Sequence, residues 1–202
     1  MQILESRKAI RTYDPTVKIT REDMLSIIKL ATLAPSSMNM QPWRFFIVES
    51  KKAKDTLATV LYGNQSQLET SAAMICLFVD LEKHRMAETI LDQAYRAGLI
   101  DESAKQRRLD YMLSQSTKQD PLLVAKWGLV DGGLVAMQFM LSAKAYGYDT
   151  CPIGGFNRDQ LAFALGLDPK RYEPVMIISI GQSAETPKQT VRLEPEHVAT
   201  FL

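Results

Sequence analysis

The segment from Ala34 to Trp43 reads Ala-Pro-Ser-Ser-Met-Asn-Met-Gln-Pro-Trp, and it separates an amphipathic run from an apolar one. Two hydroxyls and an amide stand within four positions. Short polar side chains of this kind either satisfy nearby backbone groups or reach a bound molecule. Pro35 and Pro42 fix the chain direction on both sides. The pattern alone is equally typical of a ligand-binding loop and of a helix end followed by a strand.

The residues on either side of this segment predict regular structure. Thr20 followed by Asp23 is a helix-start signal, and the apolar spacing after it predicts a helix that runs to about Ala34. Residues 44–49 are rich in Phe, Ile and Val, which predicts a strand. Ser50 then begins a helix that runs to about Tyr62.

The rest of the chain continues this alternation. Strands are predicted at 72–79 and 174–181, and the charged stretch 81–116 predicts two helices of an exposed excursion. Asp120 before a proline begins a long helix that runs to about Tyr146. Its apolar residues at helical spacing predict the face turned to the core: Leu123, Trp127, Val130, Leu134, Met137 and Leu141. Gly132 and Gly133 within the helix suggest the close approach of another backbone, from a second helix or subunit.

Few strands alternating with helices, one of them much longer than the rest, favour an α+β fold over a doubly wound parallel sheet. No Gly-x-Gly-x-x-Gly follows any predicted strand, so a Rossmann nucleotide site is disfavoured. No repeat, low-complexity tract or linker divides the 202 residues. Residues 1–202 are therefore predicted to form one domain.

Composition excludes several classes of function. A formal net charge of +1 gives no electrostatic reason to expect a nucleic-acid partner. Residues 1–14 lack the apolar core of a secretory signal, and the apolar runs at 72–79 and 175–178 are too short to span a bilayer. We therefore expect a soluble, cytoplasmic protein with no membrane partner.

Cysteine and histidine usage argues against a metal site. Cys76 and Cys151 are too few for a disulfide framework or a zinc site. Cys76 is expected to be a buried structural thiol, whereas Cys151 beside a glycine-rich turn is either reactive or packed beside a cofactor. His84 and His197 have no partner pattern and are expected at the surface.

Four separated segments of the chain resemble the nitroreductase family of FMN-dependent oxidoreductases. The segment at 34–43 resembles the family's Pro-Ser-Ser-x-Asn-x-Gln-Pro-Trp signature, and the other three are Arg7-Lys8-Ala9-Ile10-Arg11, Cys151-Pro152-Ile153-Gly154-Gly155-Phe156-Asn157 and Val191-Arg192-Leu193. They follow the family's order over nearly the whole chain. The resemblance implies a central, mostly antiparallel sheet flanked by helices, in an intertwined homodimer with shared active sites.

The resemblance also implies an enzyme. It would use FMN, take a hydride from NADH or NADPH through flavin N5, and reduce nitroaromatic, quinone or related electrophilic acceptors in a ping-pong cycle. A chain without an evident catalytic triad or metal cluster fits this chemistry, because the cofactor supplies it. The alternatives are a flavin-binding module without turnover, acting as a store or redox sensor, and a dehalogenase or flavin-degrading enzyme of the same superfamily. The acceptor, the choice between NADH and NADPH, and FMN against FAD stay open.

For the phosphate of FMN, the resemblance implies Arg7 and Arg192, because guanidinium groups match phosphate geometry and stay charged. Lys8 would add a point charge. The family often has Arg-Arg-Ser at the first segment, so Ala9 removes a hydroxyl donor here.

Two further sets of residues are assigned to the flavin by the resemblance. Asn64 and Gln67 match positions that contact the ring edge and the ribityl chain, although some members have lysine in place of Gln67. The opposite subunit would contribute Ser36, Ser37 and Asn39, and Pro35 would pack against the flavin ring.

The last assigned set follows Cys151 and consists of Pro152, Ile153, Gly154 and Gly155. A glycine pair ahead of a helix is commonly a tight turn. The functional interpretation is that the Gly155 N–H approaches flavin N5 and polarises it for hydride acceptance, which makes Gly155 the candidate catalytic residue. Many family members have Glu in place of Gly154, so their substrate specificity does not carry over. The helices between 81 and 116 are expected to form a pocket wall, with Tyr95 and Tyr111 as ring contacts.

Overall fold

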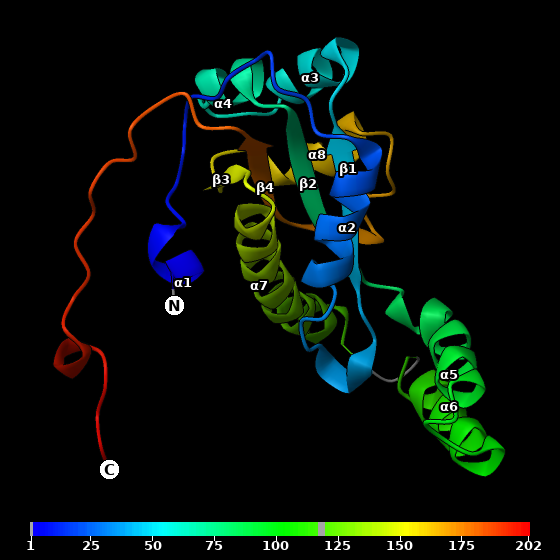
Figure 1. The fold of residues 1–202 in the computed structure, drawn as a ribbon. Helices are drawn as coiled ribbons and strands as arrows, with labels where there is room; N and C mark the ends of the chain where they lie inside the picture. The colour runs from blue at the N-terminus through cyan, green and yellow to red at the C-terminus, as the bar shows by residue number, and fades with distance from the viewer. Residues whose placement is uncertain (1, 117–119) are drawn as a thin grey trace.

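An antiparallel sheet of four strands lies at the centre of the structure, a computed structural model that describes residues 2–116 and 120–202 (Figure 1). The strand order is β1-β2-β4-β3, and each neighbouring pair is antiparallel. The strands are β1 (Trp43–Val48), β2 (Ala73–Asp80), β3 (Asp149–Ile153) and β4 (Tyr172–Gly181). This confirms the predicted α+β fold with a mostly antiparallel sheet.

Helices cover both faces of this sheet. The α-helices are α1 (Gln2–Ser6), α2 (Arg21–Ala31), α3 (Lys51–Ala58), α4 (Gln65–Thr70), α5 (Ala87–Arg96), α6 (Glu102–Ser116), α7 (Pro121–Ala145) and α8 (Arg158–Ala164). Short 3₁₀ helices are η1 (Ser37–Asn39), η2 (Lys83–Met86) and η3 (Pro195–His197). The helix predicted from 50 to 62 ends early, at Ala58, and α4 follows it after a turn. Strand β3 was not predicted, because its five residues merge with the glycine-rich turn after them.

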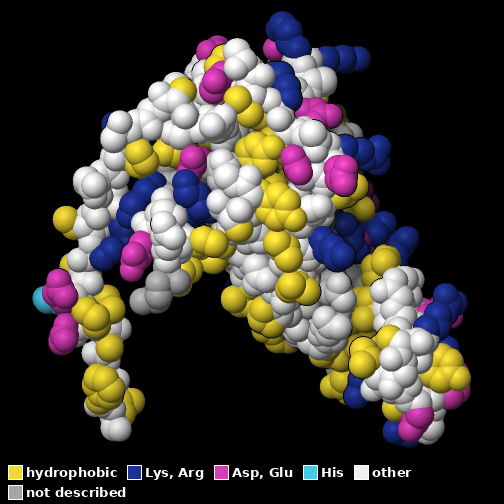
Figure 2. Space-filling model, viewed as in Figure 1, with side chains coloured by type: hydrophobic (Ala, Val, Ile, Leu, Met, Phe, Trp, Pro, Cys, Tyr) yellow, Lys and Arg dark blue, Asp and Glu magenta, His cyan; other side chains and the backbone are white. Residues whose placement is uncertain are grey.

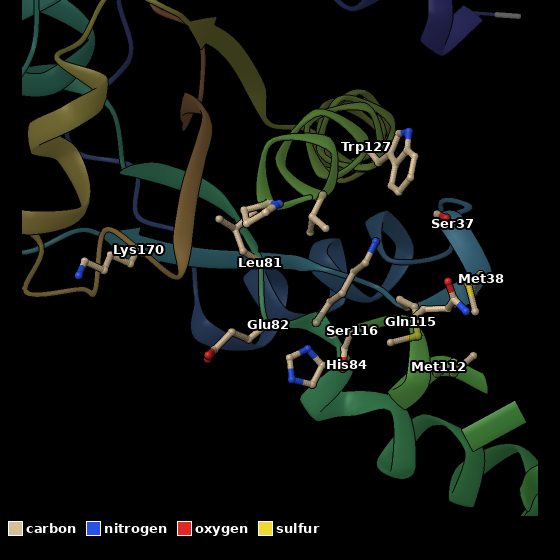
Figure 3. Close-up of a pocket in the computed structure, with 14 residues that line it drawn as sticks. Ser37, Met38, Leu81, Glu82, His84, Met112, Gln115, Ser116, Trp127 and Lys170 are labelled. Atoms are coloured by element: carbon tan, nitrogen blue, oxygen red, sulfur yellow. The ribbon is translucent and has the colours of Figure 1, made fainter. Parts of the chain in front are cut away.

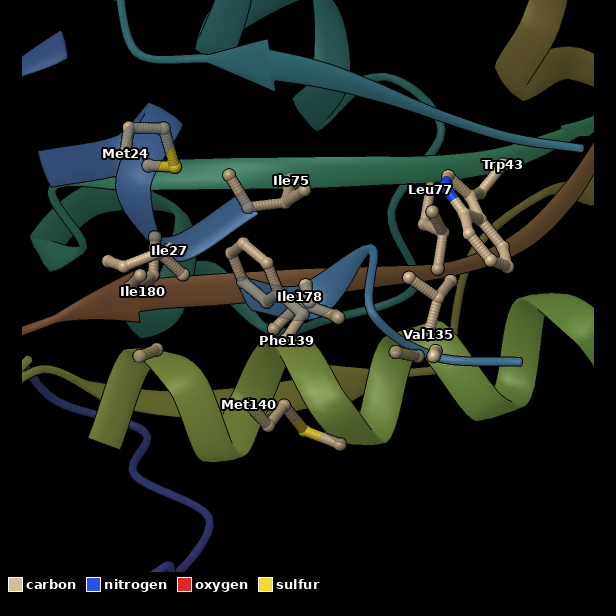
Figure 4. Close-up of a cluster of buried hydrophobic side chains, with 14 of the residues drawn as sticks. Met24, Ile27, Trp43, Ile75, Leu77, Val135, Phe139, Met140, Ile178 and Ile180 are labelled. Atoms are coloured by element: carbon tan, nitrogen blue, oxygen red, sulfur yellow. The ribbon is translucent and has the colours of Figure 1, made fainter. Parts of the chain in front are cut away.

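Side chains of β2 alternate between two cores. Ile75 and Leu77 pack with α2 and α7 on one face (Figure 4), while Met74, Cys76 and Phe78 pack with α3, α4 and α8 on the other. All eight residues of β2 are buried. Burial raises the pKa of the Cys76 thiol to about 12, which confirms an inert structural cysteine.

Asp80 at the end of β2 is the charged residue of this buried strand. Its carboxylate accepts hydrogen bonds from Arg171 Nε at 2.9 Å and Arg171 Nη2 at 2.7 Å, and Arg44 Nη2 lies 3.2 Å away. Burial alone would raise the pKa of Asp80, but these two guanidinium groups outweigh it and the pKa lies below its ordinary value. The pair of arginines therefore joins β1, β2 and the start of β4 at one edge of the structure.

The long helix α7 packs against the sheet with a different face from the one predicted. The buried residues include Ala136, and also Val135 and Phe139, whose side chains meet the sheet in Figure 4. α7 is thus a core helix as predicted, but the predicted stripe is not its core face. Leu141 of that stripe is half-buried, and the other five residues are exposed in this chain: Leu123, Trp127, Val130, Leu134 and Met137. Among the described helices, α7 is the one that is long and apolar enough to cross a membrane. The face of α7 that contains Val135 and Phe139, however, packs in the core against the sheet.

Gly132 explains how closely α7 approaches the sheet. A Cβ atom there would lie 2.5 Å from Cγ2 of Val175 on β4, and one at Gly128 would lie 2.9 Å from Cγ2 of Val79 on β2. Within the chain, the close neighbours of Gly128 and Gly132 are therefore side chains of strands, whereas the sequence predicted the backbone of a second helix or subunit. At Gly133 an added Cβ would meet nothing within 4 Å in this chain.

Replacing Gly132 with alanine is expected to destabilise the protein by about 1–3 kcal/mol, since the new methyl group overpacks the α7–β4 contact and outweighs the gain in helix propensity. Gly133→Ala is the matched control, with the same gain in propensity and no clash within the chain. Chemical denaturation of both variants measures the difference. A Gly132→Ala variant as stable as the wild type would contradict this account of the packing.

Candidate functional site

The predicted flavin residues fall into two groups that lie in separate regions of the molecule (Figure 1). The first group lies near β3 and α4 and consists of Arg7, Lys8, Ala9, Asn64, Gln67, Pro152, Ile153, Gly154 and Gly155. The second lies in the loop between α2 and β1 and consists of Pro35, Ser36, Ser37 and Asn39. The structure thus brings together the members of each group but does not bring the two groups together.

In the first group, the N-terminal segment pairs with β3. Ala9 bridges to Thr150, and the Ile10 N–H donates to the Thr150 carbonyl at 3.2 Å. Arg11 is held nearby through its backbone N–H, which donates to the Glu185 carboxylate at 2.6 Å. This pairing places the basic motif beside the strand that leads into the glycine pair.

The positive charge of this segment affects the pKa of Cys151. Burial raises the pKa of the Cys151 thiol, while the charges of Arg11 and Arg7 and a hydrogen bond from Gln67 oppose the rise. Lys and Arg side chains also gather around the N-terminal segment in Figure 2. The first group is therefore a basic site, as a phosphate ligand requires.

The amide side chains of Asn64 and Gln67 in this group are hydrogen-bonded to each other. Gln67 is only 4% exposed, and its Nε2 donates to Asn64 Oδ1 at 3.0 Å. Asn64 has a left-handed backbone with φ 59° and donates through Nδ2 to the Tyr62 carbonyl at 3.1 Å. An amide pair of this kind, with Gln67 buried and Asn64 half-buried, has fixed donors and acceptors to offer a polar ligand.

The glycine pair runs alongside the same turn. The Tyr62 N–H donates to the Gly155 carbonyl at 2.8 Å, and Leu61 bridges to Phe156. A Cβ on Gly155 would lie 3.3 Å from the Tyr62 oxygen and 3.4 Å from Asn64 Nδ2, so a side chain would crowd this contact. Within residues 2–116 and 120–202 the Gly155 N–H has no acceptor, which leaves a half-buried donor for a ligand.

Arg192 lies apart from the first group. It belongs to the C-terminal arm, residues 182–202, whose first residues pair with the N-terminal segment and whose remainder runs away from the body of the molecule (Figure 1). Its Nη1 donates to Thr190 Oγ1 at 3.0 Å and to the Val191 carbonyl at 2.8 Å, both on the arm itself. The arm also exposes the apolar side chains of Val191, Leu193, Val198, Phe201 and Leu202.

The loop that contains the second group has unusual backbone φ angles. Met38, Asn39 and Gln41 have φ values of 55°, 54° and 46°, in the left-handed region that L residues rarely adopt. One restraint on this loop is Ser36 Oγ, which accepts the Gln41 N–H at 3.0 Å. Ser37 and Asn39 are thereby presented at the surface.

Asp131 on α7 supplies the other restraint. Its Oδ1 accepts the Ser37 N–H at 3.0 Å, although the residue is only 4% exposed. Its Oδ2 has no partner among the residues that the structure describes. Sequence reasoning missed this residue, and the available signal was a carboxylate beside a glycine pair in an otherwise apolar helix.

A pocket of about 330 Å³ opens beside the second group (Figure 3). Ser37, Met38 and Met40 line it together with the start of the 81–116 excursion, the end of α6 and the start of α7. The 81–116 excursion lines this pocket through residues 81–84 and through Met112, Gln115 and Ser116. Tyr95 and Tyr111, the predicted ring contacts, do not line it. His84, expected at the surface, is half-buried in this wall, whereas His197 is exposed.

Comparison with known proteins decides the family. The model of the nitroreductase family matches residues 4–182. The chain belongs to the nitroreductase family. Among its relatives, a Bacillus subtilis protein named "Putative NAD(P)H nitroreductase YdgI" is 41% identical, with 100% of this chain and 96% of that protein covered.

Other members of the nitroreductase family share the whole fold. A crystal structure of an FMN complex from Exiguobacterium sibiricum has a TM-score of 0.96 and 42% identity, with 100% of this chain and 96% of that chain covered. The CLA biosynthesis enone reductase of Lactiplantibacillus plantarum is 31% identical, with 99% of this chain and 93% of that protein covered. The fold of the chain is therefore the fold of a known nitroreductase.

Replacing Asp131 with alanine is expected to speed hydrogen exchange at the Ser37 amide about tenfold or more, because a hydrogen bond to a charged acceptor contributes about 1.5–3 kcal/mol. Asp131→Asn is the control, since its amide oxygen still accepts the Ser37 N–H. Hydrogen exchange measured by NMR separates the two variants. Equal protection of Ser37 in the wild type and the alanine variant would show that Asp131 does not hold this loop.

Proposed function

We propose that this chain is an FMN-dependent NAD(P)H oxidoreductase that reduces nitroaromatic, quinone or related electrophilic acceptors by a ping-pong mechanism. The observation that carries the proposal is the unpaired Gly155 N–H, which stands next to Asn64 in a basic site that includes Arg7. An unpaired donor beside fixed amides and positive charge matches a ligand with an anionic end and a polar ring edge.

The residues of the first group fit FMN part by part. Arg7 and Lys8 would hold the phosphate, with Arg192 from an arm as a further candidate. The Asn64–Gln67 amide pair would hold the ribityl chain and the ring edge. Ala9, Pro152, Ile153 and Gly154 would line the site without adding charge.

Bound FMN would supply the acceptance of a hydride from NADH or NADPH and its delivery to the acceptor. The chain itself would orient the cofactor and tune it. The Gly155 N–H would donate toward flavin N5, where a fixed donor stabilises developing negative charge better than mobile water does. Gly154 brings no carboxylate to this position, so the site would have no acidic side chain beside that donor.

We further propose that two copies of the chain form a homodimer and share each site. The separation of the two groups within one chain supports this, since Pro35, Ser36, Ser37 and Asn39 would then reach the flavin held by the partner. The exposed apolar stripe of α7 and the apolar arm also support it, because a second copy would remove both surfaces from water (Figure 2).

Purified protein is expected to be yellow and to release FMN on denaturation, as identified by chromatography. It should also oxidise NADH or NADPH in the presence of a quinone, a nitroaromatic compound or an enone, the last chosen because of the L. plantarum relative's name. FMN without turnover of any acceptor would favour a flavin store or sensor. Release of iodide or bromide from halogenated substrates, or breakdown of FMN itself, would favour the other superfamily activities.

Sharing of the site predicts complementation between two inactive variants. Arg7→Glu places a negative charge against the phosphate, and Asn39→Ala removes a contact from the opposite chain. A mixed dimer concentrates both defects in one site and leaves the other intact. Co-refolding equal amounts should then restore about a quarter of wild-type activity, because half the dimers are mixed and each has one intact site.

The control is a mixture of Arg7→Glu with Gly155→Pro, two defects in the same group, which should restore nothing. Differential tags establish that mixed dimers have formed. Mixed dimers of Arg7→Glu and Asn39→Ala without activity would place both groups in a site within one chain.

A further inference from the structure

Lys83 is an unpaired cation in the pocket beside the second group. It begins η2, lines the pocket and is half-buried. Within residues 2–116 and 120–202 its ammonium forms no hydrogen bond and no ion pair within 4.0 Å. Burial lowers the pKa of Lys83, and the charge of Asp131 opposes this without direct contact. A half-buried charge without a partner is costly unless a ligand compensates it.

Glu82 and Lys170 also line this pocket, and each charge is either paired or exposed to solvent. Glu82 is paired with Arg85 at 2.9 Å and with Arg171 at 3.4 Å. Lys170 is exposed to solvent and points away from the other labelled residues in Figure 3. Lys83 is therefore the lining cation that both lacks full hydration and lacks a counter-ion.

Several of the other lining residues are apolar and suit the apolar part of a ligand. They include Met38, Met40, Met112, Val124 and Trp127. A volume of about 330 Å³ is at the small end of ligand pockets, enough for one aromatic or aliphatic acceptor. Methionine side chains adapt to ligands of different shape, and an indole offers a flat contact surface.

We propose that Lys83 binds the carboxylate of an apolar acceptor, so that this enzyme prefers carboxylated acceptors to neutral ones of the same shape. The inference rests on the proposed function, because the pocket is lined by Ser37 and Met38 of the loop that would reach the flavin. A monoanion is favoured over a phosphate dianion because the charge of the buried Asp131 carboxylate acts on Lys83 and offsets part of its positive charge.

The test compares 4-nitrobenzoate with 4-nitrobenzamide, which have nearly the same shape and differ in charge. The measured quantity is the ratio of kcat/KM for the two acceptors, with FMN-loaded protein and a fixed NAD(P)H donor. Lys83→Met is expected to lower this ratio about tenfold or more, as the loss of a hydrogen bond to a charged group implies. Lys83→Arg should retain the preference, and Lys170→Met is the matched control with the same change at a lysine that points away.

A second measurement separates the inference from the proposed function. Calorimetric binding of benzoate to the FMN-loaded protein does not require turnover. The inference is supported if Lys83→Met weakens benzoate binding at least tenfold and Lys170→Met leaves it unchanged. This support would hold even if the protein reduced no acceptor, a result that would contradict only the proposed function.

Three outcomes would overturn the inference. The first is a nitrobenzoate-to-nitrobenzamide ratio that is the same in the wild type and in Lys83→Met. The second is benzoate binding that does not depend on Lys83. The third is a Lys83→Met variant that slows flavin reduction by NAD(P)H more than it slows flavin oxidation by nitrobenzoate, which would assign the lysine to a phosphate of the donor.

Discussion

The burial of β2 on both faces is the constraint on which the rest of the structure depends. All eight residues of this strand are buried, so each face of the sheet needs its own cover of helices. This requirement brings α7 against one face, where Gly132 permits contact with Val175. It also requires two arginines around Asp80, because a buried carboxylate at the strand end is stable only when its charge is compensated.

The two groups of candidate site residues follow from that framework. β3 lies beside β4 and delivers the glycine pair next to the turn that holds Asn64, while α7 carries Asp131 under the loop that contains Ser37. Each loop is irregular, but each is fixed to a packed element. A site that must orient a flat cofactor needs such rigid support, and it tolerates the left-handed residues Met38 and Asn39 because neighbouring contacts hold them.

The α7 helix serves two surfaces at once. Gly128 and Gly132 on one face permit close packing on the sheet, whereas a row of apolar residues on the other face stays exposed in a single chain. This division explains why helical spacing of large residues gave the wrong core face. A periodic pattern reports that a face is apolar, but it cannot distinguish a core within the chain from a contact with a second copy.

The sequence by itself determined the α+β class, most helices and three of the four strands, because hydrophobic periodicity and capping residues act over a few neighbouring positions. Motif resemblance also predicted the residues of both groups as flavin contacts. Only the tertiary structure decided that these groups lie apart, that the Gly155 N–H is left unpaired, and that Asp131 and Lys83 stand beside the Ser37 loop. Contacts such as that between Ser37 and Asp131 join residues far apart in the chain, so they depend on how helices pack on the sheet, which no local pattern specifies.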